Sequence, residues 1–165
     1  MSEEETTRVA KDTIEALLAI MGLTASVAQQ EAGPVAGGEE EAGAPVAFNI
    51  EGNDLALLIG RRGQTLSCLQ YIVRLIVGHQ TESWLPIVID VEGYKQRRFE
   101  ALRTLALSIA ERVKTSKMPF TLEPMPAYER RIAHLTLADH PDVTTQSVGE
   151  GESRKVVVLL RETVD

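Results

Sequence analysis

The run Gly60-Arg61-Arg62-Gly63 carries the clearest chemical signal in the sequence. It lies between two segments whose apolar residues recur at helical spacing, 55–59 and 66–77. The second helix would begin at this turn, so its free N–H groups and the positive end of its dipole would point outward. Glycine permits positive φ and the close approach of another backbone, and the two arginines add positive charge. We therefore expect the turn to bind phosphate.

A G-x-x-G run alone is equally compatible with a tight helix–helix turn, so its sequence neighbours decide between the two interpretations. Strand-like runs precede and follow the two helices, at 46–50 and 86–91, and Asn53 or Asp54 is suited to cap the first helix. The order strand, short helix, G-x-x-G, long helix, strand is the core order of the KH domain, whose loop clamps nucleotide backbone.

Arg130 and His134 form a second candidate site. They are four residues apart in a predicted helix, 128–138, and therefore share one face. Arginine is a forked, permanently charged donor, and histidine donates from one or both ring nitrogens. The pair can hold one phosphate. The alternative is a pair that caps local backbone or packs on a sheet.

Composition and charge narrow the class of partner. The chain has 165 residues, of which 44% are apolar and only 4% aromatic, which argues against base stacking as the main source of affinity. The net charge is −7, but it is unevenly distributed. Residues 1–51 hold two basic and ten acidic side chains, whereas 61–131 hold twelve basic and seven acidic ones. The basic middle of the chain suits modest, salt-sensitive binding of nucleic acid.

Several kinds of site are not expected. The single cysteine, Cys68, excludes an internal disulfide and a cysteine metal cage, and we expect it to pack within the long helix. The three histidines lack metal-ligand partners at suitable spacing, and no P-loop, dinucleotide glycine motif or acid pair stands out. No stretch approaches the roughly 18 apolar residues of a membrane span, and no signal peptide is visible. We expect a non-catalytic, cytoplasmic protein with no metal, cofactor or transmembrane segment.

The apolar patterning predicts an α+β protein whose first domain covers 1–92. Ser2 and Glu5 fit a capping box at its first helix, which Gly22 closes. Strands near 25–29 and 46–50 follow, joined by an acidic loop, 31–45. With the two helices around the G-x-x-G turn and the last strand, the order becomes αββααβ, that of a type II KH domain.

The second predicted domain covers 93–165 and consists of helices packed on a small three-stranded sheet. Its elements are a helix at 94–114, a strand at 120–123, the helix at 128–138, and a hairpin of strands at 143–147 and 154–160. The cations of the first of these helices either solubilise its outer faces or extend the basic track from the G-x-x-G turn; they are Lys95, Arg97, Arg98, Arg103 and Arg112.

Four motifs in this order resemble the bacterial Jag family, also called SpoIIIJ-associated protein. The motifs are GRRGQTL at 60–66, DVEGY at 90–94, PMPAYERRIAH at 124–134, and SVGEG at 147–151 followed by the strand at 154–158. Members of this family join a KH domain to an Arg-x-x-x-His domain, the R-3-H domain. Many carry a further N-terminal domain, which this sequence is expected to lack.

The resemblance implies a cytoplasmic protein that binds single-stranded RNA and is linked to cell elongation, cell shape or envelope control. It also implies a small stand-alone KH protein as a partner, and no small-molecule substrate. Two alternatives stay open: a scaffold for protein interactions, which the acidic first third of the chain would suit, and a binder of single-stranded DNA.

The expected RNA-binding residues fall into two groups. The first surrounds the turn, and the second surrounds the Arg-x-x-x-His pair. Arg131 and two cations of the last strand either add to the second group or form ordinary solvated surface. The full set is Gly60, Arg61, Arg62, Gly63, Gln64, Arg130, His134, Arg131, Arg154 and Lys155.

Overall fold

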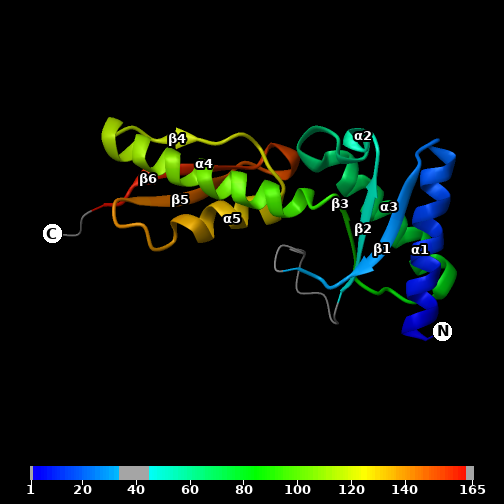
Figure 1. Ribbon diagram of the computed structural model, residues 1–165. Helices are drawn as coiled ribbons and strands as arrows, with labels where there is room; N and C mark the ends of the chain where they lie inside the picture. Colours follow the sequence, from blue (N-terminus) through cyan, green and yellow to red (C-terminus); the bar gives the residue numbers. More distant parts are fainter. Residues whose placement is uncertain (1, 34–44, 163–165) are drawn as a thin grey trace. The chain divides into compact units, whose positions relative to one another are not determined.

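A computed structural model describes residues 2–33 and 45–162, and the chain divides into two compact units, 1–95 and 96–165 (Figure 1). The predicted acidic loop, 31–45, lies for the most part outside the described residues.

The first unit has the predicted order αββααβ, which is confirmed. Its sheet has the strand order β1-β2-β3, with β1 antiparallel to β2 and β2 parallel to β3. The helices α1 and α3 pack together and against the sheet, around a core that includes Ile14, Phe48 and Val73. The elements are α1 Glu3–Ile20, β1 Ala25–Gln30, β2 Val46–Gly52, α2 Ala56–Ile59, α3 Gln64–Thr81 and β3 Ile87–Val91.

The first helix begins and ends as the sequence indicates. Ser2 Oγ accepts from the Glu5 N–H, and Glu5 accepts from the Ser2 N–H, which completes the capping box. Gly22, with φ of 71°, follows the helix in the left-handed region that glycine adopts without strain.

Three local predictions in the first unit are wrong. Neither Asn53 nor Asp54 caps α2, because Asp54 has a positive φ of 55° within the preceding turn and Leu55 occupies the N-cap position. Cys68 is exposed, because α3 buries the opposite face through Leu66, Leu69, Val73 and Val77. The helix α3 also continues beyond Val77 to Thr81, where the Trp84 ring packs so closely on Gly78 that only glycine fits.

As predicted, the second unit packs two helices on a three-stranded sheet. The sheet is antiparallel and has the strand order β4-β6-β5. The helix α4 begins in the first unit, at Tyr94, and supplies Leu102, Ala106 and Val113 to the second core. Leu105 on the same helix is 43% exposed. The elements are α4 Tyr94–Ser116, β4 Phe120–Thr121, α5 Ala127–Leu137, β5 Val143–Val148 and β6 Lys155–Leu160.

A buried ion pair joins the two helices of the second unit. Glu129 on α5 is fully buried, and its two carboxylate oxygens accept from Nε and NH2 of Arg98, each at 2.9 Å. The prediction that Arg98 lies among the outward cations of α4 is therefore wrong. The bidentate geometry is the strong form of this interaction, and the loss of one partner would leave a poorly solvated charge.

Glu129→Gln is expected to lower the free energy of unfolding of the second unit by roughly 2–3 kcal/mol, because it leaves the Arg98 guanidinium without its counter-charge. Amide hydrogen exchange in β5 and β6 measures this loss. The single tryptophan, Trp84, lies in the first unit, so its fluorescence midpoint should not change.

Glu100→Gln supplies the matched control on α4, since Glu100 is exposed and accepts from Gln96 one turn away. Equal protection of the β5 and β6 amides in both variants would contradict a stabilising role for the buried pair.

Candidate nucleic-acid interface

The G-x-x-G turn has a single well-defined backbone path. Gly60 adopts φ of 68° and ψ of −168°, and Arg62 and Gly63 follow with positive φ of 54° and 76°. One 3₁₀ turn, Arg61–Gly63, leads directly into α3, whose N-terminus has no side-chain cap among the described residues. No side chain in this part of the chain therefore accepts hydrogen bonds from the first N–H groups of α3, at the positive end of the helix dipole.

Both glycines are required by packing inside the protein. A Cβ at Gly60 would overlap Thr65 Oγ1, and a Cβ at Gly63 would come within 2.8 Å of the Tyr94 ring. The backbone angles add to this requirement, because the conformation of Gly60 is almost exclusive to glycine. A side chain at either glycine would therefore have to displace Thr65 or Tyr94.

The structure distinguishes the side chains of the turn by their exposure. Arg61 and Gln64 are exposed, Arg62 is half-buried, and Gly63 is buried. Arg61 thus places a permanent positive charge in solvent at the N-terminus of α3. A phosphate there would meet a guanidinium and a helix dipole of the same sign.

The predicted pair on α5 is held by hydroxyl groups of β5. His134 Nδ1 lies 2.6 Å from Thr145 Oγ1, and Nε2 lies 2.7 Å from Ser147 Oγ. Arg130 uses Nε to donate to the Met125 carbonyl at 3.1 Å, which leaves its terminal N–H groups for other acceptors. We call these residues, together with Arg154, the α5–β5 cluster.

Two positive charges act on the imidazole of this cluster. Burial lowers the pKa of His134 below its usual value, and the charges of Arg130 and Arg154 lower the pKa further. Arg154 also donates through NH1 to the Gly149 carbonyl at 3.1 Å. The predicted grouping of Arg130 and His134 therefore gains Arg154 as a neighbour. Arg131 is exposed and Lys155 half-buried, and neither is among the charges that shift this pKa.

Sequence analysis missed the two hydroxyls that hold the imidazole. Thr145 and Ser147 are two positions apart on one strand, so their side chains lie on the same face of the hairpin. The alternation of side chains along the strand indicates that these two hydroxyls lie on one face. The sequence does not indicate which helix packs on that face.

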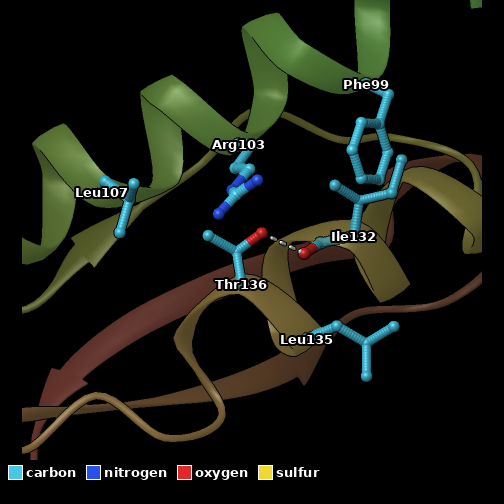
Figure 2. Close-up of a pocket in the computed structure, with 6 residues that line it drawn as sticks. All are labelled: Phe99, Arg103, Leu107, Ile132, Leu135 and Thr136. Atoms are coloured by element: carbon cyan, nitrogen blue, oxygen red, sulfur yellow. Dashed lines mark hydrogen bonds between the residues drawn. The ribbon is translucent and has the colours of Figure 1, made fainter. Parts of the chain in front are cut away.

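A groove of about 300 Å³ lies on another side of α5, between this helix and α4 (Figure 2). Apart from Arg103 its lining is mainly apolar, and the Thr136 hydroxyl already donates to the Ile132 carbonyl at 2.8 Å. Such a lining suits a sugar–phosphate chain poorly. The remaining lining residues are Phe99, Leu107 and Leu135.

Within 2–33 and 45–162, no group of three or more His, Cys, Asp or Glu side chains is arranged to hold a metal ion. In the same part of the chain, no helix has the length and apolar content needed to cross a membrane.

Comparison with known proteins matches both units. Residues 12–89 match the KH domain of KhpA/KhpB, and residues 100–160 match the R-3-H domain. The RNA-binding protein KhpB of Clostridium symbiosum is 45% identical over 113 residues, which cover 68% of this chain and 51% of the relative. The protein of the same name from Bacillus subtilis is 38% identical over 121 residues, covering 72% and 58%. The chain thus spans little more than half the length of these relatives.

Burial, together with the charges of Arg130 and Arg154, is expected to hold the pKa of His134 below the ordinary value for histidine. Arg130→Gln should raise this pKa towards its ordinary value, because it removes a nearby positive charge. Histidine NMR chemical shifts followed across pH measure both values. Arg103→Gln removes the same charge from α4 and should leave the pKa unchanged; a shift of equal size there would contradict the local cause.

Proposed function

Because the chain belongs to the Jag family, in which a KH domain of the KhpA/KhpB type is joined to an R-3-H domain, we propose that it binds single-stranded RNA and catalyses no reaction. The observation that carries the proposal is the exposed Arg61 at the uncapped N-terminus of α3. The relatives' name, RNA-binding protein KhpB, supports the choice of ligand.

The first contact is with the phosphate backbone. Internal packing holds Gly60 and Gly63 in place, so the turn can receive an RNA strand without reorganising. Arg61 and the N–H groups at the start of α3 bind phosphate and fix the position of the strand, but they do not read its sequence. Gln64, exposed at the same place, adds a polar contact.

The α5–β5 cluster supplies a second phosphate contact. The terminal N–H groups of Arg130 and the charge of Arg154 converge on the region of His134, whose ring already bonds two hydroxyls. Two weak sites on one chain reinforce each other through effective concentration, so the tandem binds more tightly than either unit alone. Arg131 and Lys155 add charge at the margin of this site.

The wider role follows from the family. We place the protein in the cytoplasm as a post-transcriptional regulator that acts in cell elongation, cell shape or envelope control. A small stand-alone KH protein is the protein partner that fits this role.

A protein scaffold is the second candidate function. Tyr71 and Ile72 on α3 are 63% and 46% exposed, which leaves an apolar face available for another protein. Single-stranded DNA is the alternative nucleic acid, and competition with an RNA of matched sequence separates the two ligands.

Arg61→Glu is expected to weaken binding of a short single-stranded RNA by about tenfold or more, because repulsion replaces a phosphate contact. Arg130→Gln should weaken it less, and should reduce the slope of log affinity against log salt by about one. Fluorescence anisotropy of a labelled RNA across a salt series measures both effects.

Arg8→Glu is the matched control, since Arg8 is exposed on α1 and undergoes the same change of charge. Equal losses for Arg61→Glu and Arg8→Glu would show that net charge, and not the turn, governs affinity. A full-length protein that binds neither RNA nor DNA would overturn the proposal in favour of the scaffold.

A further inference from the structure

The outer edge of β3 is covered by side chains and not by another strand. Among the strands that the structure describes, β3 pairs only with β2, so the outer backbone groups of Ile87 and Ile89 point away from the sheet. Arg74 Nε donates to the Ile87 carbonyl at 2.8 Å, and Gln70 Oε1 accepts from the Ile89 N–H at 2.9 Å. Two residues one turn apart on α3 therefore bind one carbonyl and one N–H group of this edge.

Lys95 completes this arrangement. Its Nζ donates to the same Gln70 Oε1 at 2.9 Å, so the amide oxygen of Gln70 already accepts two hydrogen bonds. What remains on the three side chains is the Gln70 amide N–H groups, the terminal N–H groups of Arg74, and the other N–H groups of Lys95. We call Gln70, Arg74 and Lys95 the β3-edge triad; the polar groups it has left are donors.

The triad continues directly from the G-x-x-G turn. The Tyr94 ring packs on Gly63, and Lys95 is the next residue along the chain. On α3, Gln70 and Arg74 lie about 9 Å and 15 Å along the axis from Gln64, at a rise of about 1.5 Å per residue. The few nucleotides that a G-x-x-G loop clamps would place their bases along this stretch.

Building on the proposed RNA binding, we infer that the β3-edge triad selects bases that offer two adjacent acceptors. Guanine offers O6 and N7, and cytosine offers O2 and N3 on its Watson–Crick edge. Adenine instead carries its N6 amino donor between its acceptors N1 and N7, so neither of its edges offers two adjacent acceptors. A glutamine recognises adenine by accepting from N6 and donating to N7, but the Gln70 oxygen is already occupied. Cytosine and guanine are therefore preferred over adenine.

The state of Lys95 supports this assignment. The pKa of Lys95 is lowered to about 8, mainly by burial; the charge of Asp90 opposes this shift, and the charge of Arg74 adds to it. Asp90 Oδ1 accepts from the backbone N–H groups of Val91 and Lys95, at 2.8 and 3.2 Å. The Lys95 ammonium has three N–H donors, and one of them donates to Gln70. An acceptor on a base would bind another of them and offset the cost of burying the charge.

The competing explanation is purely structural. Side chains that occupy an edge strand also prevent it from pairing with another chain, and this role requires no ligand. A structural triad would affect stability or association, but it would not affect the choice of base.

The test measures the ratio of affinities of the full chain for oligocytidylate and oligoadenylate RNA, by fluorescence anisotropy. The wild type should favour cytidylate by about fivefold or more. Gln70→Glu keeps an oxygen for Ile89 and Lys95 but replaces the amide N–H groups with an acceptor, so the ratio should fall to about one or invert. Gln80→Glu introduces the same charge at an exposed position of α3 and should leave the ratio unchanged.

Lys95→Met is a second variant that is expected to fold, because removing a buried cation with a lowered pKa should not reduce the stability of the first unit. It should lower the cytidylate preference, with Trp84 fluorescence reporting an intact first unit. A wild type that binds both RNAs equally, while Arg61→Glu still weakens binding, would overturn this inference alone. A Gln70→Glu variant that keeps the ratio would also overturn it, and a protein that binds neither RNA would overturn the proposed function with it.

Discussion

Close packing at the two glycines of the α2–α3 turn is the constraint on which the proposed RNA-binding surface depends. Gly60 lies against Thr65, and Gly63 against the ring of Tyr94, with no room for a Cβ at either position. These contacts fix the start of α3 and bring the first residue of α4 against the same turn. Because the protein's own packing sets this geometry, we expect the proposed phosphate site to need little ordering when it binds RNA.

The protein separates its arginines into those that hold the fold and those that remain for a ligand. Arg98 is committed to the buried Glu129 by two hydrogen bonds of 2.9 Å. Arg130 and Arg154 are each anchored through one backbone carbonyl and keep further N–H groups. Their effect on the pKa of His134 shows that they are close to it, and like charges held together are stabilised by an anionic ligand.

Sequence patterning identified the order of elements because apolar periodicity depends on neighbouring residues. It also placed Arg130 and His134 on one helix face, and Gly60 to Gly63 at the start of a helix. It failed where the deciding partner comes from a distant segment. Arg98 looked like a surface cation because nothing local reveals Glu129, and the hydroxyls around His134 and the coverage of the β3 edge depend on strand and helix register.

The sparing use of aromatic residues gives the hydrogen-bond donors at β3 a larger share of base selection. Only 4% of the chain is aromatic, so few rings are available on which bases can stack. The net charge of −7 opposes a strong general attraction to RNA, and at physiological salt charges interact only over about 8 Å. Selectivity must then come from short-range geometry. A row of donors beside a preformed phosphate site provides such geometry, since it recognises the acceptors of a base after the backbone has fixed its position.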